Sequence, residues 1–240
     1  MNVSDHYNNH LAHIYSWMAG DFKENAEAFG SLLDSLKIEA GENKNALDLG
    51  AGHGIQSCAL AQRGFEVTAV DFNQKMLNEL QENCKGLEVR TVFADITKVD
   101  KWTQEKPGVI VCCGDTLTHL KSREDVEEFL VKYTTLLDDQ GKMVLTFRDY
   151  TEDHNDSLYI PVKSDETRIL TCVLEYSSER VKVTDLLHEK IGGAWEQKVS
   201  SYEKVRVSPE QVKEVLKGEG LSIIHEKNEN GMVTLAASKA

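Results

Sequence analysis

The alternation of short apolar runs with helical stretches between Asn45 and Phe147 constrains the fold of this chain more than any other feature. The runs are rich in Val, Ile and Leu, and several lack strict alternation, as expected for strands buried on both faces. They are ALDLG, FEVTAV, EVRTVF, GVIVCC and KMVLTF. Between them lie helical patterns, and Ser122 is a predicted N-cap. Strand–helix repetition predicts an α/β fold with a doubly wound parallel sheet.

The pattern differs on either side of this region. Before it, two helical segments are separated near Gly20. After it, period-two stretches predict an antiparallel meander. The chain then returns to a helix capped by Ser208 and a hairpin around Asn230-Gly231. We expect one domain over residues 1–240, with an N-terminal helical lid (1–44), a ligand-binding core (45–150 and 208–240) and an antiparallel insertion on the substrate side (151–207).

Charge and composition exclude several classes of protein. The chain has 240 residues and a formal net charge of −13, so we expect no nucleic-acid partner. No run of about 18 apolar residues occurs, so we expect no membrane span and a cytoplasmic location. The five cysteines form no CxxC pair and are interpreted as buried thiols, without a disulfide framework or a metal site. A small-molecule partner is favoured, and the sequence leaves open whether the chain is a monomer or a homodimer.

Three glycines follow the first predicted strand in the pattern Asp48-x-Gly50-x-Gly52-x-Gly54. A strand that ends in glycines and opens a helix places a ligand at the carboxyl edge of a sheet. The dinucleotide fingerprint G-x-G-x-x-G requires a third glycine at position 55, which is Ile55. The phosphate loop fails as well, since no lysine follows Gly54. The ligand is therefore expected to be one without a pyrophosphate.

This pattern resembles the first motif of the class I S-adenosylmethionine-dependent methyltransferases. The resemblance implies a Rossmann-like seven-stranded sheet, S-adenosyl-L-methionine as cofactor and S-adenosyl-L-homocysteine as product. It also implies that Asp71, at the end of the second strand, accepts hydrogen bonds from the ribose hydroxyls. The expected cofactor-binding residues are Tyr15, Asp48, Gly50, Gly52, Gly54, Asp71, Phe72, Met76, Asp95, Ile96 and Cys113.

The segments VIVCCGDTLTHL and VLTFRDY are similar to those of glycine N-methyltransferase and its small-molecule relatives. The resemblance implies that Arg148 binds a substrate carboxylate, for which its planar fork is suited. It places Asp115 and His119 at catalytic positions in the loop after the fourth strand. The expected wall of the substrate site comprises Tyr150, Tyr176, Trp195 and Tyr202.

Two positions depart from that family. Asp115 replaces an asparagine, and we expect its charge to favour a cationic acceptor or to take up a proton. Asn25 replaces an arginine of the N-terminal helix. The expected activity is methyl transfer to the amine of a small, carboxylate-bearing molecule. Transfer to oxygen, sulfur or a metalloid, and cofactor binding without catalysis, remain alternatives, and the sequence does not identify the acceptor or the pathway.

Overall fold

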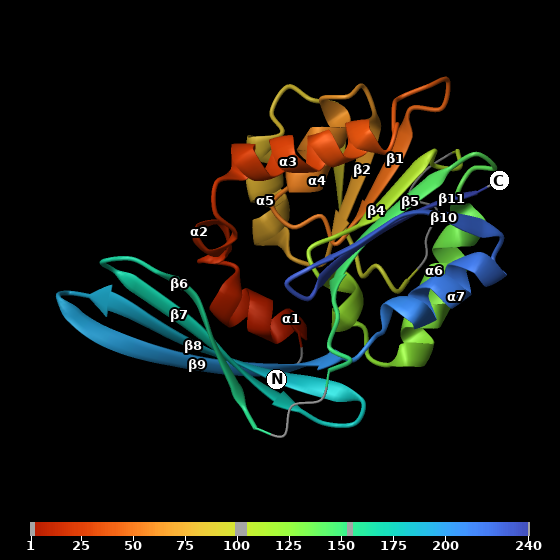
Figure 1. The fold of residues 1–240 in the computed structure, drawn as a ribbon. Coiled ribbons are helices and arrows are strands. Elements are labelled where there is room, and N and C mark those ends of the chain that lie inside the picture. Colours follow the sequence, from red (N-terminus) through yellow and green to blue (C-terminus); the bar gives the residue numbers. More distant parts are fainter. Residues whose placement is uncertain (1–2, 99–104, 153–155, 240) are drawn as a thin grey trace.

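The structure is a computed structural model and describes residues 3–98, 105–152 and 156–239. A seven-stranded sheet in the order β10-β11-β5-β4-β1-β2-β3 forms its centre (Figure 1). The five predicted apolar runs are the parallel strands, and the predicted C-terminal hairpin adds β10 and β11, with β11 antiparallel to β5. The strands are β1 (Asn45–Leu49), β2 (Glu66–Asp71), β3 (Val89–Phe93), β4 (Val109–Cys112), β5 (Lys142–Arg148), β10 (Leu221–Glu229) and β11 (Met232–Lys239).

Helices cover both faces of this sheet, which confirms the predicted doubly wound α/β fold (Figure 1). On one face, Leu33 and Leu60 pack with residues of β1, β2 and β4. On the other, Phe129 and Leu216 pack against β1, β4, β5 and β11. The first face carries α3 (Phe22–Ser35), α4 (Ile55–Ala61) and α5 (Gln74–Asn83), and the second carries α6 (Arg123–Leu136) and α7 (Pro209–Gly218).

Local signals in the sequence explain where several elements begin and end. The Ser122 hydroxyl accepts a hydrogen bond from the Asp125 amide at the start of α6, as predicted. At the start of α7, Ser208 and Gln211 form a capping box with Pro209 in the first turn. The β10–β11 hairpin turns at Asn230 and Gly231, both with positive φ.

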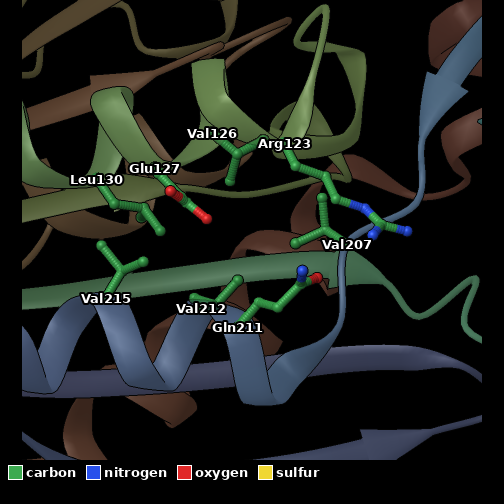
Figure 2. A pocket seen from close by; sticks show the side chains of 8 residues that line it. All are labelled: Arg123, Val126, Glu127, Leu130, Val207, Gln211, Val212 and Val215. Carbon is green, nitrogen blue, oxygen red and sulfur yellow. The ribbon is translucent and has the colours of Figure 1, made fainter. Parts of the chain in front are cut away.

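Figure 2 shows how α6 and α7 pack against each other, with Val126 and Leu130 of α6 facing Val212 and Val215 of α7. The cavity between these helices is only about 10 Å³, which is room for about one water molecule. This contact stabilises the second face of the sheet and is not a ligand site.

The predicted meander is a separate four-stranded antiparallel sheet in the order β6-β7-β8-β9. Sequence periodicity had indicated β7, β8 and β9 but not β6, which contains Pro161 and lies at the edge of the sheet, where proline is tolerated. Residues 153–155, within the predicted insertion, lie outside the described residues. The strands are β6 (Leu158–Ser164), β7 (Arg168–Tyr176), β8 (Arg180–Ile191) and β9 (Ala194–Val205).

Arg206 stabilises the end of this small sheet that adjoins the core. Its guanidinium donates to the carbonyls of Tyr150, Thr151 and Ser177 at 2.6–3.0 Å. Tyr150 and Thr151 lie where the chain leaves the core, and Arg206 lies where it returns. The two ends of the insertion are thereby held together.

The N-terminal segment lies between the small sheet and the core (Figure 1). The buried His6 binds this segment to the small sheet. Its Nδ1 is 2.7 Å from Ser200 Oγ, and its Nε2 is 3.0 Å from Asp185 Oδ2. Trp17 Nε1 donates to Asp165 in the turn between β6 and β7. The predicted break at Gly20 is confirmed, and its φ is +91°. The segment comprises α1 (Val3–His6), a π-helical turn η1 (Tyr7–Leu11) and α2 (Tyr15–Ala19).

The interpretation of all five cysteines as thiols was wrong, because Cys58 and Cys84 form a disulfide. The two residues are 26 positions apart, and the packing of α4 against α5 brings them together. Cys112, Cys113 and Cys172 are free. Within the described residues, no three His, Cys, Asp or Glu side chains are grouped so that they could hold a metal ion. No helix in this part of the chain is long and apolar enough to cross a membrane.

Candidate active site

The glycine turn connects β1 to α4, and its three glycines have φ values of +73°, +53° and +100°. A Cβ on Gly50 would lie 2.5 Å from Thr116 Cγ2, and one on Gly54 would lie 2.7 Å from Leu80 Cγ. Packing within the protein therefore requires glycine at these two positions, whether or not a ligand is bound. At Gly52 the nearest atom, Met76 Cε, is 3.4 Å away.

Asp71 ends β2 and closes the adjacent side of the turn. Its Oδ2 accepts from the Gly52 amide at 2.9 Å, and its Oδ1 accepts from the Asn73 amide at 2.8 Å. Burial raises the pKa of this carboxyl group, while these backbone hydrogen bonds act in the opposite direction. Each oxygen retains a further lone pair. The arrangement suits a ligand with two neighbouring hydroxyl groups.

Asp48 lies beneath the turn and is 1% exposed. The Ser57 hydroxyl donates to its Oδ2 at 2.6 Å. Burial raises the pKa of Asp48 to about 7, despite the opposing effect of Ser57. Asp48 therefore supports the turn from below.

The other residues predicted to surround the adenine have mixed surroundings. The Phe72 ring lies edge to face with Tyr7, with the ring centroids 5.7 Å apart. Met76 is 1% exposed and belongs to the core beneath Gly52. Asp95 is exposed, and its Oδ1 accepts from the amide and the hydroxyl of Thr97. Ile96 is buried, and its carbonyl accepts from the Tyr133 hydroxyl. Their contact with a cofactor stays a prediction.

The loop after β4 crosses the glycine turn. Cys113 is buried, its pKa is raised to about 12 by burial, and its carbonyl accepts from the Thr116 hydroxyl. Gly114 and Asp115 follow with φ values of +72° and +71°. A 3₁₀ turn, η2 (Thr116–His119), then leads away from the sheet. Thr116 is the residue that packs on Gly50, so this loop and the glycine turn fix one another's position.

Asp115 forms a buried ion pair with Lys204 of β9. Burial opposes both charges, yet each charge compensates the other, so the pKa of Asp115 lies below its ordinary value and that of Lys204 well above it. The second oxygen of Asp115 accepts from the Arg148 amide and the Thr118 hydroxyl, both at 2.8 Å. One oxygen of Asp115 is thus taken by Lys204, and its expected role toward an acceptor stays a prediction.

His119 lies beside this pair in an aromatic group. Its ring stacks on Tyr202 with the centroids 5.5 Å apart, and its Nε2 is 3.5 Å from the Tyr7 hydroxyl. Its buried Nδ1 has no hydrogen-bond partner in the part of the chain that the structure describes. Burial, together with the Lys204 charge, lowers the pKa of His119 to about 3. The imidazole is therefore neutral at physiological pH.

Tyr15 of α2 lies over the glycine turn, and its contact with a cofactor stays a prediction. Its ring is 5.2 Å from that of His53, and its hydroxyl would be 4.0 Å from a Cβ at Gly114. Tyr7 lies next to it, with the ring centroids 6.3 Å apart. The N-terminal segment thus lies over the glycine turn and the loop after β4.

Arg148 ends β5 at the opposite side of the same loop. Its amide is bound to Asp115, whereas its exposed guanidinium makes no hydrogen bond or ion pair to any described residue. Tyr150, two residues on, is buried, and burial raises its pKa to about 12. Tyr176 is partly exposed and lies 6.3 Å from Tyr150, measured between ring centroids.

Trp195 does not belong to this group, which corrects its assignment to the substrate wall. Side chains alternate between the two faces of a strand, so positions 195 and 202 of β9 point to opposite sides. Tyr202 is 7% exposed and faces the core, whereas Trp195 is 48% exposed near the tip of the β8–β9 hairpin.

A cleft of about 390 Å³ lies beside the glycine turn, between α5 and the start of α3. It reaches the turn only at His53, and Glu79 and Glu82 of α5 form its acidic side. It is separate from the group around Asp115 and Arg148.

Sequence reasoning missed two residues of the site. Lys204 lies within the predicted meander and received no role, because no local pattern marks its partner 89 positions away. Ser57 lies one helical turn beyond Gly54, and only the fold brings it to Asp48.

The comparisons with known proteins agree with this geometry. Residues 46–141 match the family model described as a methyltransferase domain. A solved S-adenosylmethionine-dependent methyltransferase from Clostridium acetobutylicum superposes with a TM-score of 0.75 at 19% identity, over 95% of this chain and 96% of that one. Residues 46–141 are therefore similar to a methyltransferase domain, and the fold of the chain is that of an S-adenosylmethionine-dependent methyltransferase.

Two curated relatives of this chain are named glycine/sarcosine N-methyltransferase. The protein from Aphanothece halophytica is 33% identical over 157 residues, which are 61% of this chain and 57% of the relative. The protein from Parasynechococcus marenigrum is 29% identical over 132 residues, covering 54% and 46%. The chain thus spans about half the length of these relatives.

The residues present fit the cofactor of the family. Asp71 offers two carboxylate oxygens, each with one backbone donor already in place, to a pair of ribose hydroxyls. Gly52 and Gly114 leave room above the main chain. The atom nearest to a Cβ at Gly52 would be the Met76 methyl group at 3.4 Å, and the atom nearest to one at Gly114 would be the Tyr15 hydroxyl at 4.0 Å. Asp71, Gly52 and Gly114 are the residues that would hold the cofactor.

Proposed function

We propose that this chain transfers the methyl group of S-adenosylmethionine to the amine of a small acceptor that carries a carboxylate. The observation that carries the proposal is the guanidinium of Arg148 at the end of β5, which has no hydrogen-bond or ion-pair partner among the described residues. An arginine fork binds a carboxylate through two parallel hydrogen bonds. The names of the two glycine/sarcosine N-methyltransferase relatives support an amino acid as the acceptor.

The charges around Arg148 support the same class of acceptor. Lys204 and Asp115 neutralise each other, so Arg148 supplies the net charge of this group of three. It does so in a chain whose formal net charge is −13. An anionic group on the acceptor is therefore favoured at this position, while a second positive charge is not.

The chain's own residues have mainly a positioning role. When bound, S-adenosylmethionine supplies a methyl group that its sulfonium already activates. Arg148 orients the acceptor carboxylate, and Tyr7 and Tyr15 exclude water above the glycine turn. Aligning two reactants in this way supplies about 7–11 kcal/mol of the barrier. Neutral His119 offers Nδ1 as a hydrogen-bond partner to the acceptor, and its low pKa makes it a poor proton acceptor.

Labelled S-adenosylmethionine and a panel of acceptors test the proposal. The panel contains glycine and its N-methylated forms, an amino sugar without a carboxylate, and phenols. We expect label only in the amino acids. Label in the amino sugar or the phenols alone would refute the carboxylate requirement, and no labelled product from any acceptor would favour cofactor binding without catalysis.

The variant Arg148→Ala tests the residue itself. We expect kcat/KM for an amino-acid acceptor to fall at least about 100-fold, since two charge-assisted hydrogen bonds are lost. Affinity for S-adenosylhomocysteine, measured by calorimetry, should stay within about threefold of the wild type. Lys217→Ala removes an exposed charge from α7, away from the site, and is the matched control. An unchanged kcat/KM in Arg148→Ala would remove the carboxylate assignment.

A further inference from the structure

Lys204 is a cation of the acceptor-side sheet that lies inside the protein. It belongs to β9, is 8% exposed, and its ammonium group binds Asp115. The ammonium nitrogen is 5.8 Å from the ring centroids of both Tyr150 and Tyr202. A buried lysine keeps its charge only with a partner, and Asp115 is that partner.

Asp115 connects Lys204 to two other parts of the site through its two carboxylate oxygens. One of its oxygens takes the Lys204 ammonium, and the other accepts from the Arg148 amide and the Thr118 hydroxyl. The ion pair therefore joins β9 to the end of β5, where the acceptor carboxylate is proposed to bind, and to the loop after β4.

That loop needs such a contact to keep its shape. Gly114 and Asp115 both have a left-handed backbone, which is unfavourable for a residue other than glycine. The next residue, Thr116, fills the space where Gly50 lacks a Cβ. A shift of the loop would move the glycine turn with it.

We propose that Lys204 is a positioning residue of the methyl transfer, which acts through Asp115 to set the loop after β4 against the glycine turn and the end of β5. The small sheet that covers the acceptor and the turn that holds the cofactor are thereby assembled together. The inference rests on the proposed function, since it presumes that the cofactor lies on that turn. It assigns to Lys204 a role in cofactor affinity, although Lys204 does not itself reach the turn.

The test uses three variants of the full chain. Lys204→Met keeps the length of the side chain and removes its charge, which leaves Asp115 buried and unpaired. Asp115→Asn leaves Lys204 unpaired. The double variant restores electrical neutrality and keeps a side-chain oxygen for the Arg148 amide. Lys198→Met is the control, because Lys198 lies on the same face of β9 but binds Glu189 away from the site.

Binding of S-adenosylhomocysteine, measured by calorimetry between pH 5.5 and 8.5, is the main readout. We expect Lys204→Met to bind at least tenfold more weakly at pH 8.5 and to recover affinity as the pH falls. The sign follows from burial: an unpaired Asp115 would have a raised pKa, so its charge is present above that pKa and is removed below it. The double variant and Lys198→Met should bind within about threefold of the wild type at every pH.

The possible outcomes separate this inference from the proposed function. Failure of the wild type to bind S-adenosylhomocysteine would refute the proposed cofactor. Wild-type-like binding by a folded Lys204→Met, or a loss that neither lower pH nor Asp115→Asn reverses, would overturn the inference alone. A change in Lys204→Met that is confined to the KM for the acceptor would also overturn the inference alone. If Lys204→Met does not fold, the double variant must bind at least tenfold more tightly than Asp115→Asn; otherwise the inference is wrong.

Discussion

Ser57 donates a hydrogen bond of 2.6 Å to Asp48, and the two side chains are 0% and 1% exposed below the glycine turn. Burial raises the pKa of Asp48 to about 7. Below that pH the carboxyl group is protonated in the folded protein, although an exposed aspartate would be ionised. The Asp48 side chain below the glycine turn is therefore a neutral carboxylic acid over part of the physiological pH range.

The pH dependence of stability tests this state of Asp48. Between about pH 4 and pH 7 the folded protein binds the Asp48 proton more tightly than the unfolded chain does. The free energy of unfolding should therefore fall as the pH rises through this window, by about 4 kcal/mol at most, and level off above it. Denaturant titrations of the wild type and of Asp48→Asn check this, since the variant lacks the titrating group. Parallel curves for the two proteins would contradict it.

Asp71→Ala should weaken binding of S-adenosylhomocysteine at least about 100-fold in calorimetry. Two charge-assisted hydrogen bonds to the ribose would be lost, each contributing about 1.5–3 kcal/mol. Asp71→Asn is the comparison, because an amide retains one acceptor oxygen, and we expect intermediate affinity. Affinity equal to that of the wild type in the alanine variant would remove the ribose assignment.

Gly50→Ala should destabilise the protein by about 2 kcal/mol or more, as measured by thermal unfolding. The added methyl group would meet Thr116 at 2.5 Å, and φ is +73°. The control is Gly192→Ala, where φ is +59° but no atom lies within 4 Å. A second substitution, Thr116→Ala, should recover part of the loss at Gly50 and none at Gly192. Equal losses at the two glycines would mean that the contact with Thr116 is unimportant.

Thiol titration of the denatured protein checks the disulfide between Cys58 and Cys84. Without reductant we expect three reactive thiols, from Cys112, Cys113 and Cys172, and with reductant all five cysteines should react. Closure of this loop stabilises the fold by about 3 kcal/mol in the chain-entropy model, so reduction should lower the melting temperature. The variant Cys58→Ser/Cys84→Ser should be insensitive to reductant. Five thiols in the unreduced protein would refute the pairing.

The sequence was sufficient for features that depend on neighbouring residues. The apolar runs predicted the five parallel strands of the central sheet, the Asn230-Gly231 turn predicted the β10–β11 hairpin, and the Ser122 and Ser208 caps follow from the first turn of each helix. The position of Trp195 could also have been predicted, since strict alternation along β9 places it opposite Tyr202.

Features that depend on distant contacts could not be predicted in this way. Asp115 and Lys204 are 89 positions apart, and Cys58 and Cys84 meet only because α4 packs on α5. Charge and spacing along the chain do not reveal such pairs, because the packing of separate sheets and helices determines which side chains meet. The sequence therefore gave no indication that Lys204 is the partner of Asp115.

The three hydrogen bonds of Arg206 hold together the two ends of the segment between Thr151 and Val205, where this segment leaves the core and returns to it. A segment joined in this manner is suited to exchange as a cassette, because a short peptide could bridge its two ends. Because the segment includes Lys204, a different cassette would have to keep that lysine for Asp115 to remain paired and the glycine turn to stay in place.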